Sequence, residues 1–366
     1  MKRLKYIMLY IGLLVINACS SEKIAPDGET EQSIDVHLAA SISESDNNSR
    51  SDNNTYIKTA FTTDDEIRLV NTVFFNTPDF TNENTIFTYV GAENNKYKFT
   101  QSGQSSTTGG SDDTGITWND FSPTSFVYMF EAVYYPGNKP FTNVPDNQDE
   151  NNGEEFQKAD LLIAHHRMPL EDRYKEIELT FHHAFAMVRV NVSVPIGVGG
   201  LQKDAFTEAY VHGVQSGFTV NYSSTMSNNG LRAVYGTGEK KDITMWRQSE
   251  ISSDNKTQTY TFLAIIPVPN DEEGGKIDQD DFVRFKVKVD NNTEKTYRFV
   301  RNEDAGGIVL SQSRITVLNL KWDVNEGLPL LLSASIEPWK EASADMILDG
   351  EDSNSNENNQ EGGSNP

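Results

Sequence analysis

The sequence predicts an all-β protein with enough chain for two β-sandwich domains in tandem, and three observations favour this. Apolar residues alternate with polar ones over many short segments, which is the pattern of a strand with one buried face. The segments between them are rich in Asn, Asp, Gly and Ser, which are typical of turns and loops. Outside the first 18 residues, no window of helical length keeps a 3.6-residue apolar period, and 366 residues suffice for two ordinary domains.

Residues 1–18 have the layout of a signal peptide. A basic start precedes an apolar run that is shorter than the roughly 20 residues of a membrane-spanning helix, so the run indicates export. The next residue, Cys19, is the single cysteine and has no internal disulfide partner. The sequence Ile16-Asn17-Ala18-Cys19 resembles the lipobox of bacterial lipoproteins, although Asn17 departs from the usual small residue. The resemblance implies that Cys19 carries lipid; the alternative is a plain secretory peptide with a chance cysteine.

The chain is strongly acidic, with a formal net charge of −23. Residues 1–18 contain three positive and no negative side chains, so the remainder carries −26. A surface of this sign argues against binding to DNA, RNA or anionic lipid through basic residues, and no nucleic-acid partner is expected.

The first predicted strand follows a polar tether at residues 19–32. Its apolar positions alternate strictly with the residues between them: Ile34, Val36, Leu38, Ala40 and Ile42. The thirteen residues SESDNNSRSDNNT come next and contain one basic side chain, Arg50. A loop of this composition is predicted to be accessible to proteases.

Further strands are predicted along the rest of the chain. In the N-terminal half, alternation marks Ile67 with Leu69, Tyr97 with Phe99, and Phe126 with Tyr128 and Phe130, separated by predicted loops at 101–115 and 146–155. Residues 177–194 alternate in two registers, which predicts a bulge or a strand buried on both faces. Residues 260–266 are predicted to form a strand that ends at Pro267. Residues 283–299 are predicted to form a hairpin with one solvent-exposed face.

These elements group into an N-terminal domain at 33–172 and a C-terminal domain at 173–348. The boundary is placed in the polar stretch MPLEDRYKE, and the tail at 349–366 is low in complexity and is predicted to be disordered.

Neither a metal site nor a cofactor is expected. The pairs His165-His166 and His182-His183 supply at most one ligand per sheet face, because adjacent strand residues point to opposite faces. Surface or hydrogen-bonded core histidines are therefore favoured. The acidic stretches 146–155 and 270–281 lack the EF-hand order, so solvated loops are favoured and an irregular loop calcium stays open.

No catalytic motif is present, and the protein is not expected to be an enzyme. The sequence contains no GxSxG elbow, Walker loop or GxGxxG turn after a strand, and acylation would consume Cys19. The tryptophans could stack on sugars, but core burial is favoured for them: Trp118, Trp246, Trp322 and Trp339.

A late apolar segment is a candidate donor strand. Its alternating residues are Leu328, Leu330, Leu332, Ala334 and Ile336. If residues 20–50 were removed, a sheet would lose its first strand, and a terminal strand from another subunit could fill the groove. The residues alone favour the simpler arrangement, in which each strand stays in its own sheet.

Six segments resemble motifs of the fimbrillin family, the pilins and pilin-like lipoproteins of gut and oral Bacteroidales. Their order and spacing over nearly the whole chain carry the resemblance: TTDDEIRLV (62–70), DLLIAHH (160–166), LTFHHAFAMVRVNV (179–192), AIIPV (264–268), SRITVLNLKW (313–322) and SIEPW (335–339). The resemblance implies two transthyretin-like Greek-key β-sandwich domains and lipid-dependent transport to the outer membrane. It also implies cleavage by a trypsin-like protease at an arginine that Arg50 matches, and polymerisation by donor-strand exchange with the strands around 328–348 as donor. The polar tail after Leu348 is longer than a minimal pilin end.

The expected function is that of a structural or adhesive subunit of a cell-surface fimbria, delivered as an outer-membrane lipoprotein. Its expected partners are other fimbrial subunits, in a homopolymer or heteropolymer, and a ligand on a host or bacterial surface. The alternative is a lipid-anchored glycan-binding protein of the cell surface.

Overall fold

The computed structural model describes most of the chain between residues 34 and 338. The described ranges are 34–43, 57–71, 86–101, 116–121, 123, 127–197, 200–221, 233–269, 275–277, 281–290, 293–301 and 308–338. The chain divides into units at residues 1–34 and 35–366, and every element below belongs to the second unit. The predicted signal peptide, Cys19, the tether, Arg50, Trp339 and the polar tail lie outside the described residues.

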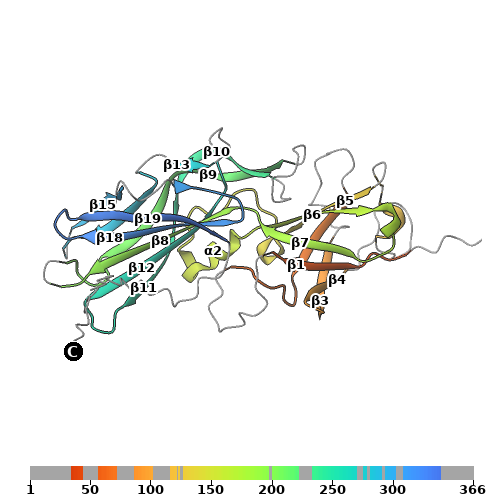
Figure 1. The fold of residues 1–366 in the computed structure, drawn as a ribbon, viewed down its shortest axis with the longest axis horizontal. Coiled ribbons are helices and arrows are strands. Elements are labelled where there is room, and N and C mark those ends of the chain that lie inside the picture. Colours follow the sequence, from red (N-terminus) through yellow and green to blue (C-terminus); the bar gives the residue numbers. More distant parts are fainter. Residues whose placement is uncertain are drawn as a thin grey trace, which may run out of the picture. The chain divides into compact units, whose positions relative to one another are not determined.

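Seven strands in the N-terminal part form a closed barrel (Figure 1). Their order around the barrel is β1-β4-β3-β2-β5-β6-β7. The strands are β1 (Leu38–Ile42), β2 (Glu66–Asn71), β3 (Ile86–Glu93), β4 (Lys96–Gln101), β5 (Val127–Tyr134), β6 (Leu162–Pro169) and β7 (Ile177–His183).

The barrel closes because β1 pairs on both of its edges. It runs antiparallel to β4 and parallel to β7, so it joins the two ends of what would otherwise be an open sheet. The two-sheet Greek-key sandwich expected for the first domain is therefore replaced by one closed sheet. β7 is the last strand of the barrel, and the next strand along the chain belongs to a different sheet. The domain boundary predicted near residue 172 stays a prediction.

An aromatic cluster fills the barrel. The Phe61 ring lies edge-on to four other rings, with centroid separations between 5.1 and 5.5 Å: Tyr97, Phe99, Tyr134 and Phe181. Edge-to-face contacts at this separation place the positive ring edge against a negative ring face. Phe61 follows the protease-sensitive loop predicted around Arg50, so this part of the chain contributes directly to the core.

Two facing sheets make up the C-terminal part. The six-stranded sheet has the order β11-β12-β8-β18-β19-β16, the four-stranded sheet has the order β10-β9-β14-β15, and β13 pairs with β17. The strands are β8 (Ala186–Pro195), β9 (Phe206–Asn221), β10 (Ala233–Thr244), β11 (Trp246–Ile251), β12 (Thr257–Ile266), β13 (Lys276–Ile277), β14 (Val283–Lys288), β15 (Glu294–Arg298), β16 (Val300–Arg301), β17 (Ile308–Val309), β18 (Arg314–Asp323) and β19 (Leu328–Pro338).

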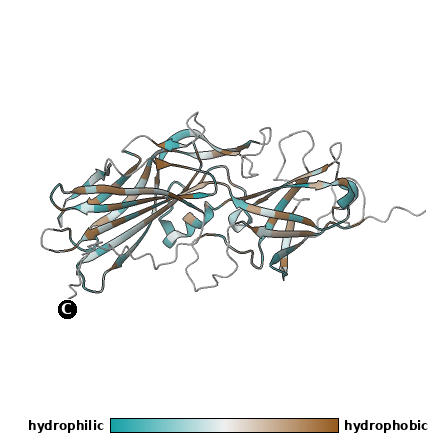
Figure 2. Cartoon of the chain, viewed as in Figure 1, coloured by the Kyte–Doolittle hydropathy of each residue, from teal (hydrophilic) through white to brown (hydrophobic). Residues whose placement is uncertain are grey.

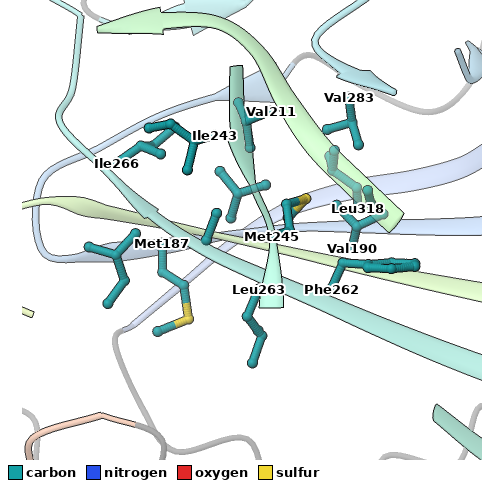
Figure 3. Close-up of a cluster of buried hydrophobic side chains, with 14 of the residues drawn as sticks. Met187, Val190, Val211, Ile243, Met245, Phe262, Leu263, Ile266, Val283 and Leu318 are labelled. Atoms are coloured by element: carbon teal, nitrogen blue, oxygen red, sulfur yellow. The ribbon is translucent and has the colours of Figure 1, made fainter. Parts of the chain in front are cut away.

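Apolar side chains from both sheets meet in one core. Figure 3 shows Val190 and Phe262 of the six-stranded sheet with Val211 and Val283 of the four-stranded sheet, and all four side chains are fully buried. Along the strands, brown apolar and teal polar positions alternate in Figure 2. This two-residue period is the feature from which the sequence predicts strands.

The strand predictions are largely confirmed. The prediction that residues 177–194 form one strand, with a bulge or with both faces buried, is wrong, because the two registers belong to two strands: β7 ends at His183 and β8 begins at Ala186, in a different sheet. The predicted hairpin at 283–299 is β14 paired antiparallel with β15. The long pair β9 and β10 was not predicted, because register shifts interrupt its alternation and Gly213 has a left-handed φ of 68°.

The stretch 146–155 connects β5 to β6 without a strand, as predicted for a loop, but the expectation that it is a solvated loop is wrong. This stretch includes Gln148, which is fully buried and exchanges two hydrogen bonds with the Ile265 backbone. The helical segments of the described chain are short: η3 (Trp118–Asp120), η4 (Pro136–Asn138), η5 (Glu150–Gly153), α2 (Glu154–Lys158) and η6 (Leu170–Asp172). Within the described ranges, no helix has the length and apolar character needed to span a bilayer.

Candidate functional site

The first strand of the barrel occupies a slot between β4 and β7. Leu38 pairs with Phe99 on one side and with Ile177 on the other. The backbone bonds continue past the ends of β1, because the Ile177 N–H donates to the His37 carbonyl and the Ser43 N–H donates to the Phe181 carbonyl. β1 therefore has the pairing of a central strand although it lies near the start of the described chain.

The side chains of β1 alternate between the barrel interior and the outside. Leu38 is 1% exposed, Ala40 is 2% exposed and Ile42 is 5% exposed, and all three belong to the barrel core. The sequence predicts this face correctly. The burial also means that removal of β1 would uncover the core residues on both neighbouring strands.

Two ion pairs close over the outer face of β1. Lys96 and Lys98 of β4 reach across β1 to Glu178 of β7 and to Glu176, which precedes β7. Ala39 lies beneath this bridge, opposite both Lys98 and Glu178, and is only 1% exposed. The slot therefore requires a small side chain at the outward position in the middle of the strand.

A buried polar network fixes the chain that follows the Arg50 region. Lys58 Nζ lies 2.6 Å from Asp65 Oδ2, and Tyr134 donates its hydroxyl proton to Asp65 Oδ1 at 3.0 Å. The Lys58 ammonium also lies 5.0 Å from the centre of the Tyr134 ring. Burial, reinforced by the negative charge of Asp65, raises the pKa of Tyr134 well above its usual range.

The same segment is held by Asp160, the first residue of the motif DLLIAHH. The Lys58 backbone N–H donates to Asp160 Oδ2 at 2.7 Å, and Asp160 Oδ1 lies 2.6 Å from His183 Nδ1. Both side chains of the Asp160–His183 pair are almost completely buried. Residue 58 and its neighbours are thus attached to β7 through contacts that do not involve β1.

The histidine motifs form hydrogen-bonded pairs in the barrel wall. His165 Nδ1 lies 2.6 Å from Glu131 Oε1 across the β5–β6 pairing, and both side chains are buried. Burial, together with the charge of neighbouring His165, lowers the pKa of His166. The prediction that the histidines are hydrogen-bonded core residues is confirmed for His165 and His183. In the part of the chain that the structure describes, no three His, Cys, Asp or Glu side chains come together as a metal-binding group.

The candidate donor strand lies within its own sheet as β19. It pairs with β18 along its length, while β16 meets it only at Leu330 and Leu331. The simple alternation predicted for this strand is interrupted, because the register shifts between Asn319 and Leu320 and leaves Leu332 in a bulge. Leu331 is fully buried as a result, whereas Leu332 is 44% exposed and Ile336 is 47% exposed.

The described tryptophans are core residues. Trp118, Trp246 and Trp322 are each less than 7% exposed. Trp118 is surrounded by edge-on aromatic rings, among them Phe121 and Tyr128, and Trp246 packs against Phe156. The prediction that the tryptophans are buried in the core is confirmed for these three residues.

Comparison with known proteins gives matches to fimbrial and adhesion proteins. A proposed cell adhesion protein of Bacteroides uniformis has a TM-score of 0.50 and 15% identity, covering 86% of this chain and 100% of its own, so the two have a similar fold. The fimbrial anchor protein Mfa2 of Porphyromonas gingivalis has 8% identity and a TM-score of 0.33, covering 83% of this chain and 98% of its own. The fimbrial tip protein Mfa3 of the same organism has 8% identity and a TM-score of 0.37, covering 84% and 99%.

At the level of sequence, no curated protein gives a significant match. A family model described as fimbrillin-like matches residues 49–339. Because this match covers well over half of the chain, the protein belongs to the fimbrillin-like family.

Proposed function

We propose that the protein is a structural or adhesive subunit of a cell-surface fimbria that assembles by donor-strand exchange after cleavage at Arg50. Lipid on Cys19 would deliver the chain to the outer membrane, and the cut would separate that lipid from the assembled subunit. Family membership supports a fimbrial or adhesive role. The position of β1 in the barrel is the observation that supports the mechanism.

The slot of β1 suits an exchangeable strand. β1 comes before Arg50 in the chain, so the cut would leave it joined to the barrel only by hydrogen bonds and side-chain packing. Its departure would leave unpaired backbone groups on β4 and β7 and an apolar groove where Leu38, Ala40 and Ile42 had been. Such a groove binds an extended strand through backbone hydrogen bonds and side-chain pockets.

The residues that follow the proposed cleavage site are held in the barrel by contacts that do not involve β1. Lys58 and Phe61 follow Arg50 and are held by Asp160 and by the aromatic cluster. The large fragment would therefore keep these contacts when β1 leaves. Other fimbrial subunits are the partners in this proposal, and the chain is not an enzyme.

The alternative of a glycan-binding lipoprotein loses part of its motivation among the described residues. It was motivated by β-sandwiches, acidic charge and exposed aromatic side chains that could stack on sugars, but Trp118, Trp246 and Trp322 are all buried. No described cluster of exposed aromatic residues replaces them.

Limited trypsin digestion tests the proposal. An unlipidated Cys19→Ser chain is treated with trypsin, and mass spectrometry and gels follow the products. The expected result is a large fragment that begins at Ser51, followed by a ladder of oligomers. Arg50→Ala is the matched control and should remain uncut at this position and monomeric. A wild-type chain that is cut at Arg50 and then stays monomeric would contradict assembly by strand exchange.

A further inference from the structure

Two ion pairs cross the slot that holds β1. Lys98 Nζ lies 2.7 Å from both carboxylate oxygens of Glu176. Lys96 Nζ lies 2.5 Å from Glu178 Oε1. The lysines belong to β4, and the glutamates lie on β7 or directly before it, so both pairs pass over the outer face of β1 between these strands. We call these four residues the strap.

Ala39 is the outward residue of β1 that lies beneath the strap. It pairs with Lys98 on one side and with Glu178 on the other, and it is only 1% exposed. The outward residues before and after it are less covered, since His37 is exposed and Ser41 is half-buried. The outer face of the strand is therefore closed where the strap crosses it.

We propose that the strap selects the strand that the slot accepts. It admits an extended segment of another fimbrial subunit that carries Gly, Ala or Ser at the position of Ala39, and it excludes a segment with a large side chain there. The inference rests on the proposed strand exchange. It adds the feature by which the outer face of an incoming strand is recognised and the residues that recognise it.

The lysine stems set the space under the strap. A lysine side chain can lay its methylene groups over an apolar surface while its ammonium group reaches a carboxylate. Lys98 starts opposite Ala39 and ends at Glu176, so its stem covers the Ala39 methyl group. A serine in this place adds one hydroxyl group, which can donate to a strap carboxylate. A leucine adds three carbon atoms and overfills the space unless the ion pair opens.

The strap also restricts the register of an incoming strand. The neighbours of Ala39 in β1 are the barrel-core residues Leu38 and Ala40. A shift of one residue turns every inward side chain outward, and in one direction it would place Leu38 under the strap. The barrel core and the strap thus test alternate residues of the same strand, which must be apolar on the inside and small on the outside.

The strap can open and close because its ion pairs are accessible to water. The side chains of Lys96 and Glu178 are 39% and 59% exposed, and those of Lys98 and Glu176 are 27% and 31% exposed. Exposed ion pairs are individually weak, so they do not prevent a strand from leaving. All four residues follow Arg50, so the strap stays with the large fragment after cleavage and is available to the next strand.

A double-mutant cycle in the uncut chain tests the strap itself. Ala39→Leu is measured by urea denaturation in the Cys19→Ser chain and in the same chain with Lys96→Ala and Lys98→Ala. The leucine should lower the folding equilibrium constant at least about tenfold more when the strap is present, because the overfilled space is relieved when the stems are removed. Ala39→Val is measured alongside, so that the comparison stands if the leucine variant fails to fold.

Two controls match the substitutions of the cycle. His37→Leu places a leucine at the exposed outward position and should change the equilibrium constant less than about threefold. Lys158→Ala with Lys241→Ala removes two lysines from ion pairs elsewhere and should leave the effect of Ala39→Leu unchanged. An equal loss from Ala39→Leu with and without the strap would overturn the proposal, since the cover over Ala39 would then come from another part of the chain.

Peptide binding tests selection of an incoming strand. A labelled peptide with the sequence of residues 33–44 contains no Lys or Arg, so it resists trypsin. It is added to the Cys19→Ser chain after the cut at Arg50. The Ala39→Ser peptide should bind within about threefold of the unmodified peptide, and the Ala39→Leu peptide at least about tenfold more weakly. With Lys96→Ala and Lys98→Ala in the protein, the penalty for leucine should fall below about threefold.

The outcomes separate this inference from the proposed function. Peptides that bind with equal affinity whatever residue stands at position 39 would overturn selection by the strap and leave strand exchange intact. A cut chain that binds none of the peptides would contradict strand exchange and, with it, the selection of incoming strands.

Discussion

Arg189 of β8 reaches across β18 to Glu337 of β19, with its Nη2 atom 2.6 Å from Glu337 Oε2. The arginine side chain is 8% exposed, and its Nε is buried without a hydrogen-bond partner among the described atoms. This ion pair therefore joins the candidate donor strand to the centre of its own sheet, and its strength contributes to the free energy needed to release that strand.

Glu337→Gln should weaken this attachment. The substitution removes the negative charge facing a nearly buried guanidinium, which should lower the free energy of unfolding by about 1–2 kcal/mol. Urea denaturation of the uncut protein measures the change. Glu326→Gln in the exposed β18–β19 turn is the control and should have little effect. Equal effects of the two substitutions would show that the Arg189 pair adds no stability.

Asp160→Asn should destabilise the barrel strongly. The substitution leaves His183 without its buried carboxylate and places an amide where Asp160 accepts from the Lys58 N–H. A loss of about 3 kcal/mol is expected, because one partner of a buried pair is removed. The control is Asp172→Asn, which breaks an exposed pair with Lys175 and should cost less than about 1 kcal/mol. Denaturant midpoints that are equal for the two variants would contradict this account.

His166→Gln should reduce the dependence of stability on pH below neutrality. The folded pKa of His166 is lowered by burial and by His165, so the unfolded chain binds this proton more readily. The folded protein therefore loses stability from His166 as the pH falls below about 6.5, the ordinary value of the imidazole. Unfolding free energies measured from pH 5 to 8 should fall less steeply in the variant. Above pH 7.5 the two curves should run parallel, and parallel curves over the whole range would contradict the prediction.

Gly153→Ala should disrupt the packing beneath α2. Gly153 has a φ of +87°, and a Cβ atom there would overlap the indole of Trp246. Backbone strain and overlap together should lower stability by about 2–4 kcal/mol. Gly137→Ala is the matched control, since its φ is +64° but its Cβ would meet open space. That control should lose only about 1 kcal/mol, and a shift in Trp246 fluorescence should accompany the first variant alone. Equal losses would mean that overlap with Trp246 contributes nothing.

The local pattern of the sequence predicts the strands well because it depends only on neighbouring residues. Alternation places Leu38, Ala40 and Ile42 on one buried face of a strand, and the structure confirms that face. The same reasoning fails where a strand is irregular. In β19, the bulge at Leu332 moves Leu331 into the core, and the bulge depends on pairing with β18 rather than on the residues of β19 themselves.

The sequence by itself determined the all-β class, the buried face of β1 and the motifs that indicate the family. Only the tertiary structure decided that β1 lies between β4 and β7, that the sheet closes into a barrel, and that Asp160 pairs with His183. The physical reason is that every strand offers the same backbone donors and acceptors. Side-chain periodicity specifies which face of a strand is buried, but the choice of neighbouring strand depends on packing between residues far apart in the chain.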